Sequence, residues 1–413
     1  MEERLMKAVL AKKEMALLES RVKNEVLLDI ASTLINHQDK ILLANKIDLA
    51  NAKMNHYHSS FVDRLELSGK RIQAMVDGLV EVSKLDDPIG KTLESKYRPN
   101  GLLIVKKTVA LGVIGVIYES RPNVTVDTFA LCFKSGNVSV LRGGKEAIET
   151  NKVLVHLIHQ VLEKHYISKD VLIFIEDTRR ESAKELMKMA GYLDLLIPRG
   201  SASLIETVKK ESKVPVIETG SGVCHLYVDK EADIDMAVKV AYNAKVDRPA
   251  VCNSIETILV DETVKVAFLD KLAKSMKDIV VFKGCPKTKE ILKDIEEAKE
   301  EDYYKEYDDL FINIKVTSSL TEAIDHINTH STHHSETIIS SNDQTTKLFF
   351  EFVDSAVVYQ NASTRFSDGF EFGYGAEVGI STQKLHARGP MGLFALTTTK
   401  YYVYGSGQIR KTS

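Results

Sequence analysis

The chain has 413 residues, enough for two or three domains, and its 44% hydrophobic and 27% charged residues are typical of a globular protein. Its longest strongly apolar run, 109–118, is about half of the ~20 residues that cross a bilayer. The formal net charge of −3 excludes the overall basic field that dominates nucleic-acid binding, and the mixed charges of the first residues do not resemble a secretory signal. We therefore expect a cytoplasmic protein with neither a membrane nor a nucleic acid as partner.

Two patterns follow in chain order. Up to about residue 84, apolar residues such as Val26, Ile30 and Leu34 recur at three- and four-residue steps, which predicts amphipathic helices. From 96 to 228, short apolar runs alternate with helical patterns, and these runs are 112–118, 138–141, 171–175, 193–197, 215–217 and 225–228. Strands that are apolar on both faces and separated by helices indicate a buried parallel sheet. A doubly wound, nucleotide-binding domain is the natural expectation.

Near Asp229 the alternation begins again and predicts a second α/β unit. Helical patterns at 233–244, 264–277 and 320–328 alternate with strand patterns at 255–260 and 310–316. We interpret the charged segment 287–302 as a solvent-facing helix. The tail 401–409 is aromatic and β-branched, so we expect a strand that pairs with a neighbouring subunit.

None of the four cysteines belongs to a C-x-x-C pair, so neither a zinc site nor a disulfide framework is indicated; they are Cys132, Cys224, Cys252 and Cys285. Cys252 is the best nucleophile candidate, because it lies in a polar loop directly before a strand pattern, with Arg248 nearby to favour the thiolate. Cys132 lies in a helical stretch and is expected in the core. Cys224 and His225 would point to opposite faces of a strand, which disfavours a thiol–base pair.

Asn123 follows the strand 113–117, at the end of the sheet where open α/β proteins bind ligands. Its amide is a neutral donor suited to a developing oxyanion. A simple turn residue after Pro122 is the alternative.

Gly143 and Gly144 follow the strand 138–141 and lie between two cations, Arg142 and Lys145. This arrangement could bind the ribose or a phosphate of a cofactor. A solvent-exposed turn without a ligand explains the same pattern equally well. The common G-x-G-x-x-G and P-loop fingerprints are absent from the sequence, and the glycines at 373–379 have the wrong spacing, so we interpret that segment as a tight loop.

Seven blocks of the sequence resemble, in order, the gamma-glutamyl phosphate reductases, a family of the aldehyde dehydrogenase superfamily; they are 113–125, 134–137, 141–144, 248–253, 333–336, 361–366 and 375–392. The resemblance implies an α/β fold of aldehyde dehydrogenase type, with a Rossmann-like cofactor domain, a second α/β catalytic domain and a small β oligomerisation element. It also implies a dinucleotide site without the usual glycine turn.

The domains implied by this resemblance are an NADPH-binding domain at 1–225, with 94–110 in an oligomerisation hairpin, and a catalytic domain at 226–365. Residues 366–413 would form a return segment and an oligomerisation tail. We therefore expect a homo-oligomer. Glutamate 5-kinase, the pathway neighbour, is a candidate partner.

The implied reaction is NADPH-dependent reduction of L-glutamyl 5-phosphate to L-glutamate 5-semialdehyde and phosphate, the second step of proline synthesis from glutamate. Cys252 would form a thioester, with Asn123 and the Cys252 backbone N–H holding the oxyanion. Glu218 matches the glutamate that activates water in hydrolytic relatives, although this reaction needs no such water. The implied cofactor-binding residues are Arg142, Gly143, Gly144, Lys145 and, at the nicotinamide ribose, Asp309.

On the substrate side, Arg365 follows the apolar strand 355–359 and is expected to grip the α-carboxylate with two parallel hydrogen bonds, unless it is an ordinary surface ion. His334 and Glu336 are weaker candidates for the α-ammonium group. The cluster of His330, His333 and His334 could also indicate a metal, but the reaction needs no Lewis acid and no carboxylate pattern supports one, so we expect none. The other substrate-binding candidates are Arg121, Ser363 and Thr364.

Two other classes stay open. A cysteine hydrolase or acyltransferase would use Cys252 with a histidine and no dinucleotide, and a scaffold without catalysis would bind a cofactor without turnover. Within the enzyme interpretation, the alternative is a phosphate-independent semialdehyde dehydrogenase that runs in the oxidative direction.

Overall fold

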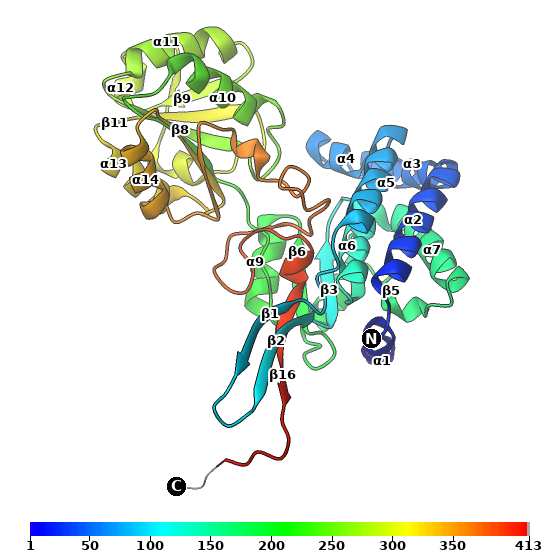
Figure 1. Ribbon diagram of the computed structural model, residues 1–413. Helices are drawn as coiled ribbons and strands as arrows, with labels where there is room; N and C mark the ends of the chain where they lie inside the picture. Colours follow the sequence, from blue (N-terminus) through cyan, green and yellow to red (C-terminus); the bar gives the residue numbers. More distant parts are fainter. Residues whose placement is uncertain (411–413) are drawn as a thin grey trace. The chain divides into compact units, whose positions relative to one another are not determined.

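The computed structural model describes residues 1–410, apart from the side chains of Ser59 and Ser60, and divides into two compact units (Figure 1). The first unit comprises Met1–Glu218, Gly373–Gly379 and the chain from Met391 onward. The second comprises Thr219–Phe372 and Ile380–Pro390. The division at Glu218 precedes the boundary expected at 225, and both units share the segment expected to form a separate return and tail. No helix among the described residues is long and apolar enough to span a bilayer.

The first unit opens with five helices, as the three- and four-residue periodicity predicted. They are α1 (Glu2–Met15), α2 (Ser20–Asn36), α3 (Gln38–Met54), α4 (Ser59–Leu65) and α5 (Gly69–Lys84). The stripe of Val26, Ile30 and Leu34 on α2 is fully buried, and α2 packs against α5. Helix α5 begins where the Ser68 hydroxyl caps it by accepting from the Arg71 backbone N–H.

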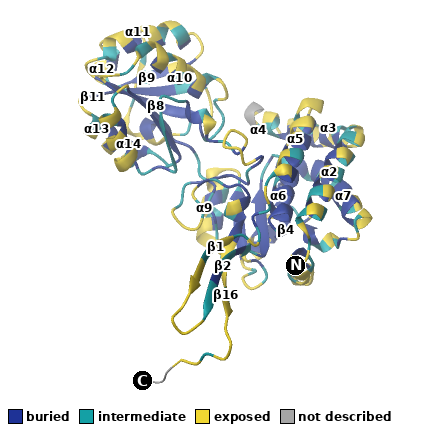
Figure 2. Cartoon of the chain, viewed as in Figure 1, coloured by how far each residue is buried: buried dark blue, intermediate teal, exposed yellow. Residues whose placement is uncertain are grey.

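A four-stranded parallel sheet of order β5-β4-β3-β6 forms the centre of the first unit. All residues of β3 and β4 are buried, which explains their continuous apolar runs (Figure 2). The elements are β3 (Val113–Tyr118), α6 (Asn123–Lys134), β4 (Val138–Gly143), η1 (Lys145–Ala147), α7 (Ile148–Lys164), η2 (Lys169–Val171), β5 (Leu172–Phe174), α8 (Arg180–Met187), β6 (Leu195–Arg199) and α9 (Ala202–Glu211).

Two strand predictions for this sheet were wrong. The run 215–217 makes only a single bridge, between Val216 and Leu196. The run 225–228 is a strand, but it pairs in the second unit. An apolar run predicts burial, and the sheet that buries it depends on the tertiary fold.

The second unit has a seven-stranded parallel sheet of order β10-β9-β11-β8-β7-β12-β13. Leu226, Ile258 and Ile314 from its central strands pack with Phe268 and Leu272 in one buried cluster. The elements are β7 (Cys224–Val228), α10 (Ile234–Val246), β8 (Ile255–Asp261), α11 (Lys265–Met276), β9 (Val281–Gly284), α12 (Pro286–Lys289), β10 (Glu296–Glu297), η3 (Glu300–Tyr304), β11 (Phe311–Thr317), α13 (Leu320–His330), β12 (Ser335–Ile339), α14 (Asp343–Phe352), β13 (Val357–Gln360), η4 (Thr364–Phe366), β14 (Ile380–Ser381) and β15 (Gly389–Pro390).

The segment 287–302 is not the single solvent-facing helix that its charges predicted. It contains α12, β10 and the start of η3. Ile291, Leu292 and Ile295 pack against the core of the second unit, and β10 pairs with β9. These apolar contacts keep the chain beside the sheet, although most of its other side chains are charged.

A separate three-stranded antiparallel sheet, of order β1-β2-β16, belongs to the first unit (Figure 1). Its strands are β1 (Thr92–Tyr97), β2 (Leu103–Ala110) and β16 (Thr397–Tyr404), and η5 (Leu393–Leu396) precedes β16. The tail thus pairs with β2 of its own chain, from Thr397 opposite Ala110 to Tyr404 opposite Leu103, whereas the sequence predicted a strand that pairs with a neighbouring subunit. Most residues of β1 and β16 are exposed (Figure 2).

Candidate active site

Cys252 lies in the loop 247–254 of the second unit, between the end of α10 and the start of β8. The residue is half-buried, and its carbonyl oxygen accepts a hydrogen bond from the Cys224 thiol at 3.1 Å. Gly222 lies so close that a Cβ there would come within 1.4 Å of the same oxygen. The backbone of Cys252 is therefore held from the side of β7, while its side chain is carried on a loop.

Cys224 is fully buried, and burial raises the pKa of its thiol. A thiol that stays protonated donates a hydrogen bond and is a poor nucleophile. Cys132 is also fully buried, on α6, where burial raises the pKa of its thiol to about 12. These environments leave Cys252 and Cys285 as the half-buried cysteines, and the Cys285 sulfur lies 3.4 Å from the Thr288 hydroxyl at the start of α12.

A buried pair of ionisable side chains joins the two elements that flank this loop. Lys245 near the end of α10 and Glu256 in β8 are fully buried, with Nζ and Oε2 2.8 Å apart. Burial raises the pKa of Glu256 to about 8, against the lowering effect of Lys245. Sequence reasoning missed both residues, because nothing in their local pattern marks them as neighbours.

Three of the substrate-side candidates gather at the same loop, in and beside η4. The Thr364 hydroxyl donates to the carbonyl oxygen of Asn253 at 2.6 Å, and the Ser363 hydroxyl accepts from the Arg365 backbone N–H at 3.3 Å. The Arg365 guanidinium forms an ion pair with Asp247 at 3.2 Å. The structure thus brings these residues to the nucleophile loop, where Thr364 and Arg365 bind protein groups.

Glu336 lies in β12 and His334 directly precedes that strand, and both residues are fully buried. Glu336 Oε2 accepts from the backbone N–H of His225 at 2.6 Å, and its Oε1 accepts from the Ser355 hydroxyl at 3.1 Å. His334 Nδ1 lies 2.9 Å from the Ser335 hydroxyl and 3.8 Å from the Cys224 sulfur. His334 thus contacts the thiol of Cys224, which binds the Cys252 carbonyl oxygen, and Glu336 binds the adjacent residue His225.

In the first unit, Asn123 is the first residue of α6, directly after the turn that follows β3. Its Nδ2 donates to Asp127 Oδ2 at 2.8 Å. Burial raises the pKa of Asp127 to about 6, although the Asn123 hydrogen bond lowers it. An amide nitrogen carries two hydrogens, so the Asp127 contact orients Asn123 and leaves it the capacity for a second donation. Arg121 lies in the same turn and is half-buried.

The predicted cofactor residues follow one another at the end of β4. Arg142 is 8% exposed, and its Nη2 donates to the carbonyl oxygens of Thr178 and Arg179 at 2.5 and 2.9 Å, whereas its buried Nε has no partner among the described residues. A Cβ on Gly143 would come within 2.5 Å of Asn151 Nδ2, so the strand end carries no side chain there. After Gly144 the chain reaches Lys145, which is exposed.

Two further candidates are farther along the chain. Glu218 is the last residue of the first unit before the division and forms an ion pair with Lys209 at 3.1 Å. Asp309 is exposed in the second unit, and its Oδ1 accepts from the backbone N–H of Leu310 at 2.8 Å, directly before β11.

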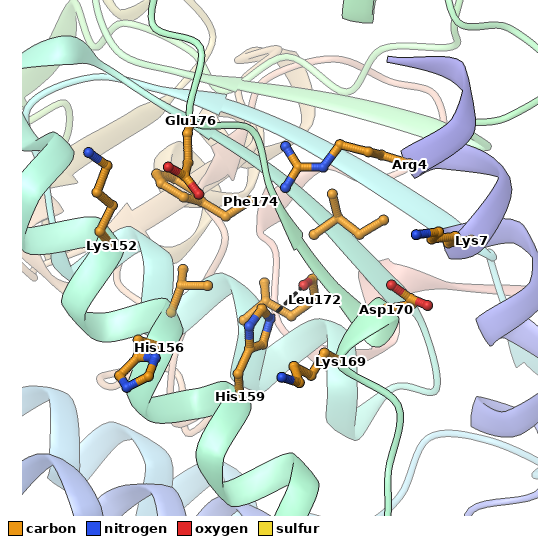
Figure 3. Close-up of a pocket in the computed structure, with 12 residues that line it drawn as sticks. Arg4, Lys7, Lys152, His156, His159, Lys169, Asp170, Leu172, Phe174 and Glu176 are labelled. Carbon is orange, nitrogen blue, oxygen red and sulfur yellow. Dashed lines mark hydrogen bonds between the residues drawn. The ribbon is translucent and has the colours of Figure 1, made fainter.

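A cavity of about 460 Å³ lies beside the edge strand β5 of the first unit, between α1, α7 and η2 (Figure 3). Its lining is mainly basic above an apolar floor, and none of the predicted site residues takes part; the ionisable lining residues are Arg4, Lys7, Lys152, His156, His159, Lys169, Asp170 and Glu176. His159 lies 2.9 Å from the Leu172 carbonyl oxygen, and burial lowers the pKa of its ring. The cavity is thus distinct from the predicted active-site residues.

The chain matches known proteins along nearly its whole length. The model of the aldehyde dehydrogenase family matches residues 1–302. The gamma-glutamyl phosphate reductases of Carboxydothermus hydrogenoformans and Ligilactobacillus salivarius are 51% and 52% identical, over 98% and 97% of both chains. The crystal structure of gamma-glutamyl phosphate reductase from Thermotoga maritima is 44% identical, superimposes with a TM-score of 0.95 and is covered to 99%, as is this chain. These matches confirm the predicted fold, and the chain belongs to the gamma-glutamyl phosphate reductases within the aldehyde dehydrogenase family of oxidoreductases.

Proposed function

We propose that the protein reduces L-glutamyl 5-phosphate to L-glutamate 5-semialdehyde and phosphate with NADPH, through a thioester on Cys252, as the second step of proline synthesis. The names of the relatives support the reaction. The single observation that carries the mechanism is the half-buried Cys252, whose carbonyl oxygen is fixed by Cys224 and crowded by Gly222.

The chemistry begins from an activated acyl group, because a free carboxylate resists both nucleophiles and hydride. The Cys252 thiolate attacks the acyl carbon, and a tetrahedral oxyanion forms. As the oxyanion collapses, the carbon–oxygen bond to phosphate breaks, and phosphate leaves with the electron pair. Cys252 is then held as a thioester. Asn123 and the Cys252 backbone N–H are the proposed oxyanion donors, and each is worth on the order of 10²-fold in kcat.

Family membership implies a nicotinamide cofactor, and the end of β4 fits one. Gly143 and Gly144 leave the strand end without side chains, so a cofactor could approach the backbone there. The buried N–H of Arg142 Nε has no acceptor among the described residues, and Lys145 is exposed to solvent. We assign these four residues to the adenosine half and Asp309 to the nicotinamide ribose. When bound, the cofactor supplies the hydride that reduces the thioester. Collapse of the resulting thiohemiacetal releases the aldehyde and restores the Cys252 thiolate.

The family resemblance suggests roles for the two units and for the remaining site residues. We assign most of the cofactor site to the first unit, and the nucleophile, together with Asp309, to the second. Glu218 belongs to the site without a water-activating role, and Arg121 is proposed to bind substrate. His334 and Glu336 are proposed for the α-ammonium side of the substrate, and Ser363 and Thr364 are proposed to bind the substrate through their hydroxyls. We also propose a cytoplasmic homo-oligomer, with glutamate 5-kinase as pathway neighbour.

Steady-state assay of the reverse reaction, with and without phosphate, tests the proposal. We expect NADP⁺ reduction by L-glutamate 5-semialdehyde to require phosphate, because phosphate must release the acyl group from Cys252. A rate of NADP⁺ reduction that does not depend on phosphate would indicate a semialdehyde dehydrogenase that works in the oxidative direction. NADPH binding without turnover would indicate a scaffold, and hydrolysis without a dinucleotide would indicate a cysteine hydrolase.

A further inference from the structure

The residue next to the nucleophile is held by a reciprocal contact. Asn253 is 4% exposed, and its side-chain Nδ2 donates to the backbone carbonyl oxygens of Arg365 and Ser367 at 3.3 and 2.9 Å. Arg365 returns the contact, because its Nη1 donates to Asn253 Oδ1. Asn253 and Arg365 therefore bind each other in both directions.

The hydroxyl of Thr364 adds a fourth contact, at 2.6 Å from the Asn253 carbonyl oxygen. Both side-chain polar atoms and the carbonyl oxygen of Asn253 are thus engaged by η4 and the residue that follows it. Because Asn253 directly follows Cys252, these contacts fix the chain on the carboxyl side of the nucleophile.

Arg365 also reaches the opposite end of the loop. Its Nε lies 3.2 Å from Oδ2 of Asp247, the first residue after α10. The Arg365 side chain is 18% exposed, so water weakens this charge-assisted contact only partly. One guanidinium group therefore ties the first residue of the loop 247–254 to the residue beside Cys252.

We infer that Arg365 is a positioning residue, which holds the loop 247–254 in the shape that presents the Cys252 sulfur to the substrate. The inference rests on the proposed function, in which Cys252 is the nucleophile. Displacing a reacting group by about 1 Å can cost on the order of 10²-fold in rate. Nε and Nη1 serve two different partners, and the single ammonium group of lysine lacks this planar fork.

This role differs measurably from a grip on the substrate α-carboxylate. An arginine that binds the carboxylate governs KM for glutamate semialdehyde and has no effect on an aldehyde without that group. An arginine that positions the nucleophile governs kcat for both aldehydes. Asp247 separates the two roles further, because removing its charge frees the guanidinium for a substrate but loosens the loop.

The test compares Arg365→Lys and Asp247→Asn with the wild type in NADP⁺ reduction, with phosphate present, on L-glutamate 5-semialdehyde and on butanal. We expect kcat to fall about tenfold or more for both variants and both aldehydes, with KM little changed. The matched control is Asp235→Asn, which breaks an exposed ion pair with Lys271 in the same unit and should keep wild-type values. Thermal unfolding shows whether each variant is folded.

The two substitutions also separate position from charge. Arg365→Lys keeps the positive charge and Asp247→Asn removes a negative one, so an effect of charge alone would leave the kcat of the first variant unchanged and alter only that of the second. Positioning lowers kcat in both. Asp247 is half-exposed, so Asp247→Asn decides the question even if Arg365→Lys fails to fold.

Wild-type kcat in Asp247→Asn, or a loss confined to the semialdehyde and to KM, would overturn the positioning role. Full turnover by Cys252→Ala would instead overturn the proposed function. The two failures are therefore distinguishable.

Discussion

The Cys252 side chain can be shortened without removing the contact between its carbonyl oxygen and Cys224. We expect Cys252→Ala and Cys252→Ser to abolish reduction, because no other group can form the thioester, while the Kd for NADPH stays within a few fold of wild type. Fluorescence titration with NADPH and an assay with the acyl phosphate measure the two effects. Cys285→Ala is the control and should stay active; marked turnover by Cys252→Ala would exclude the assignment.

Cofactor choice should depend more on Lys145 than on Arg142. Arg142 already donates to two carbonyl oxygens, whereas Lys145 is exposed and forms no ion pair within residues 1–410. A cation at this place favours the 2′-phosphate of NADPH. We expect Lys145→Glu to narrow or reverse the preference for NADPH over NADH, with little change in kcat. The ratio of kcat/KM for the two cofactors measures this, and an unchanged ratio would show that Lys145 points elsewhere.

At the residue scale, the sequence singles out the proposed nucleophile but not the residues that hold its loop. Cys252 stands out because a polar loop precedes a strong strand pattern. Cys224, Asp247 and Asn253 have no such mark, since their contacts with Cys252 and Arg365 form only when the chain folds. The same limit applies to Arg365, for which the sequence predicts a surface or substrate-binding cation and the structure shows a partly buried ion pair.

The Lys245–Glu256 pair links α10 to β8 and should make stability depend on pH. The folded-state pKa of Glu256, about 8, exceeds its usual value of 4.5, so between these values the folded state binds more protons than the unfolded state. Stability from this group is therefore present at low pH and is lost as pH rises toward 8. Glu256→Gln should gain stability relative to wild type over that range, by up to about 1.4 kcal/mol per pH unit.

Urea unfolding at several pH values between 5 and 8 measures this difference. If the difference in unfolding free energy between wild type and Glu256→Gln stays constant with pH, Glu256 is ionised throughout this range. Glu322→Gln, which removes an exposed carboxylate with a lowered pKa, is the control, and it should not show a gain in that range.

Among the elements, periodicity locates helices and strands better than it assigns them to sheets. The opening helices and most strands agree with their patterns, because burial on one face or both faces dictates the spacing of apolar residues. The run 225–228 was placed in the wrong sheet, because a strand's partners depend on long-range pairing. The charged segment 287–302 hid three partly buried residues, Ile291, Leu292 and Ile295, whose packing outweighs the pattern of charges.

For the whole molecule, the sheet β1-β2-β16 is the proposed oligomerisation element. Val403 and Tyr404 are 55% and 53% exposed. Neighbouring apolar side chains on a strand that are this exposed indicate a surface covered by another subunit. We expect Val403→Lys with Tyr404→Lys to yield a smaller species in light scattering coupled to gel filtration. Leu17→Lys, at an apolar residue that is 84% exposed outside this sheet, should leave the mass unchanged. An unchanged mass in the double variant would place the interface elsewhere.

The path of the chain through its two units has a consequence for biosynthesis. Strand β2 leaves the ribosome early, but its partner β16 is made after the whole second unit, and the Leu396 carbonyl oxygen that accepts from Asn137 at 2.9 Å arrives equally late. The first unit therefore cannot complete its folding until the second unit has been made, because one edge of β2 and the Asn137 amide find their partners only in residues 396–404. A ribosome that stalls within the second unit leaves both exposed, and such nascent chains are natural clients for chaperones.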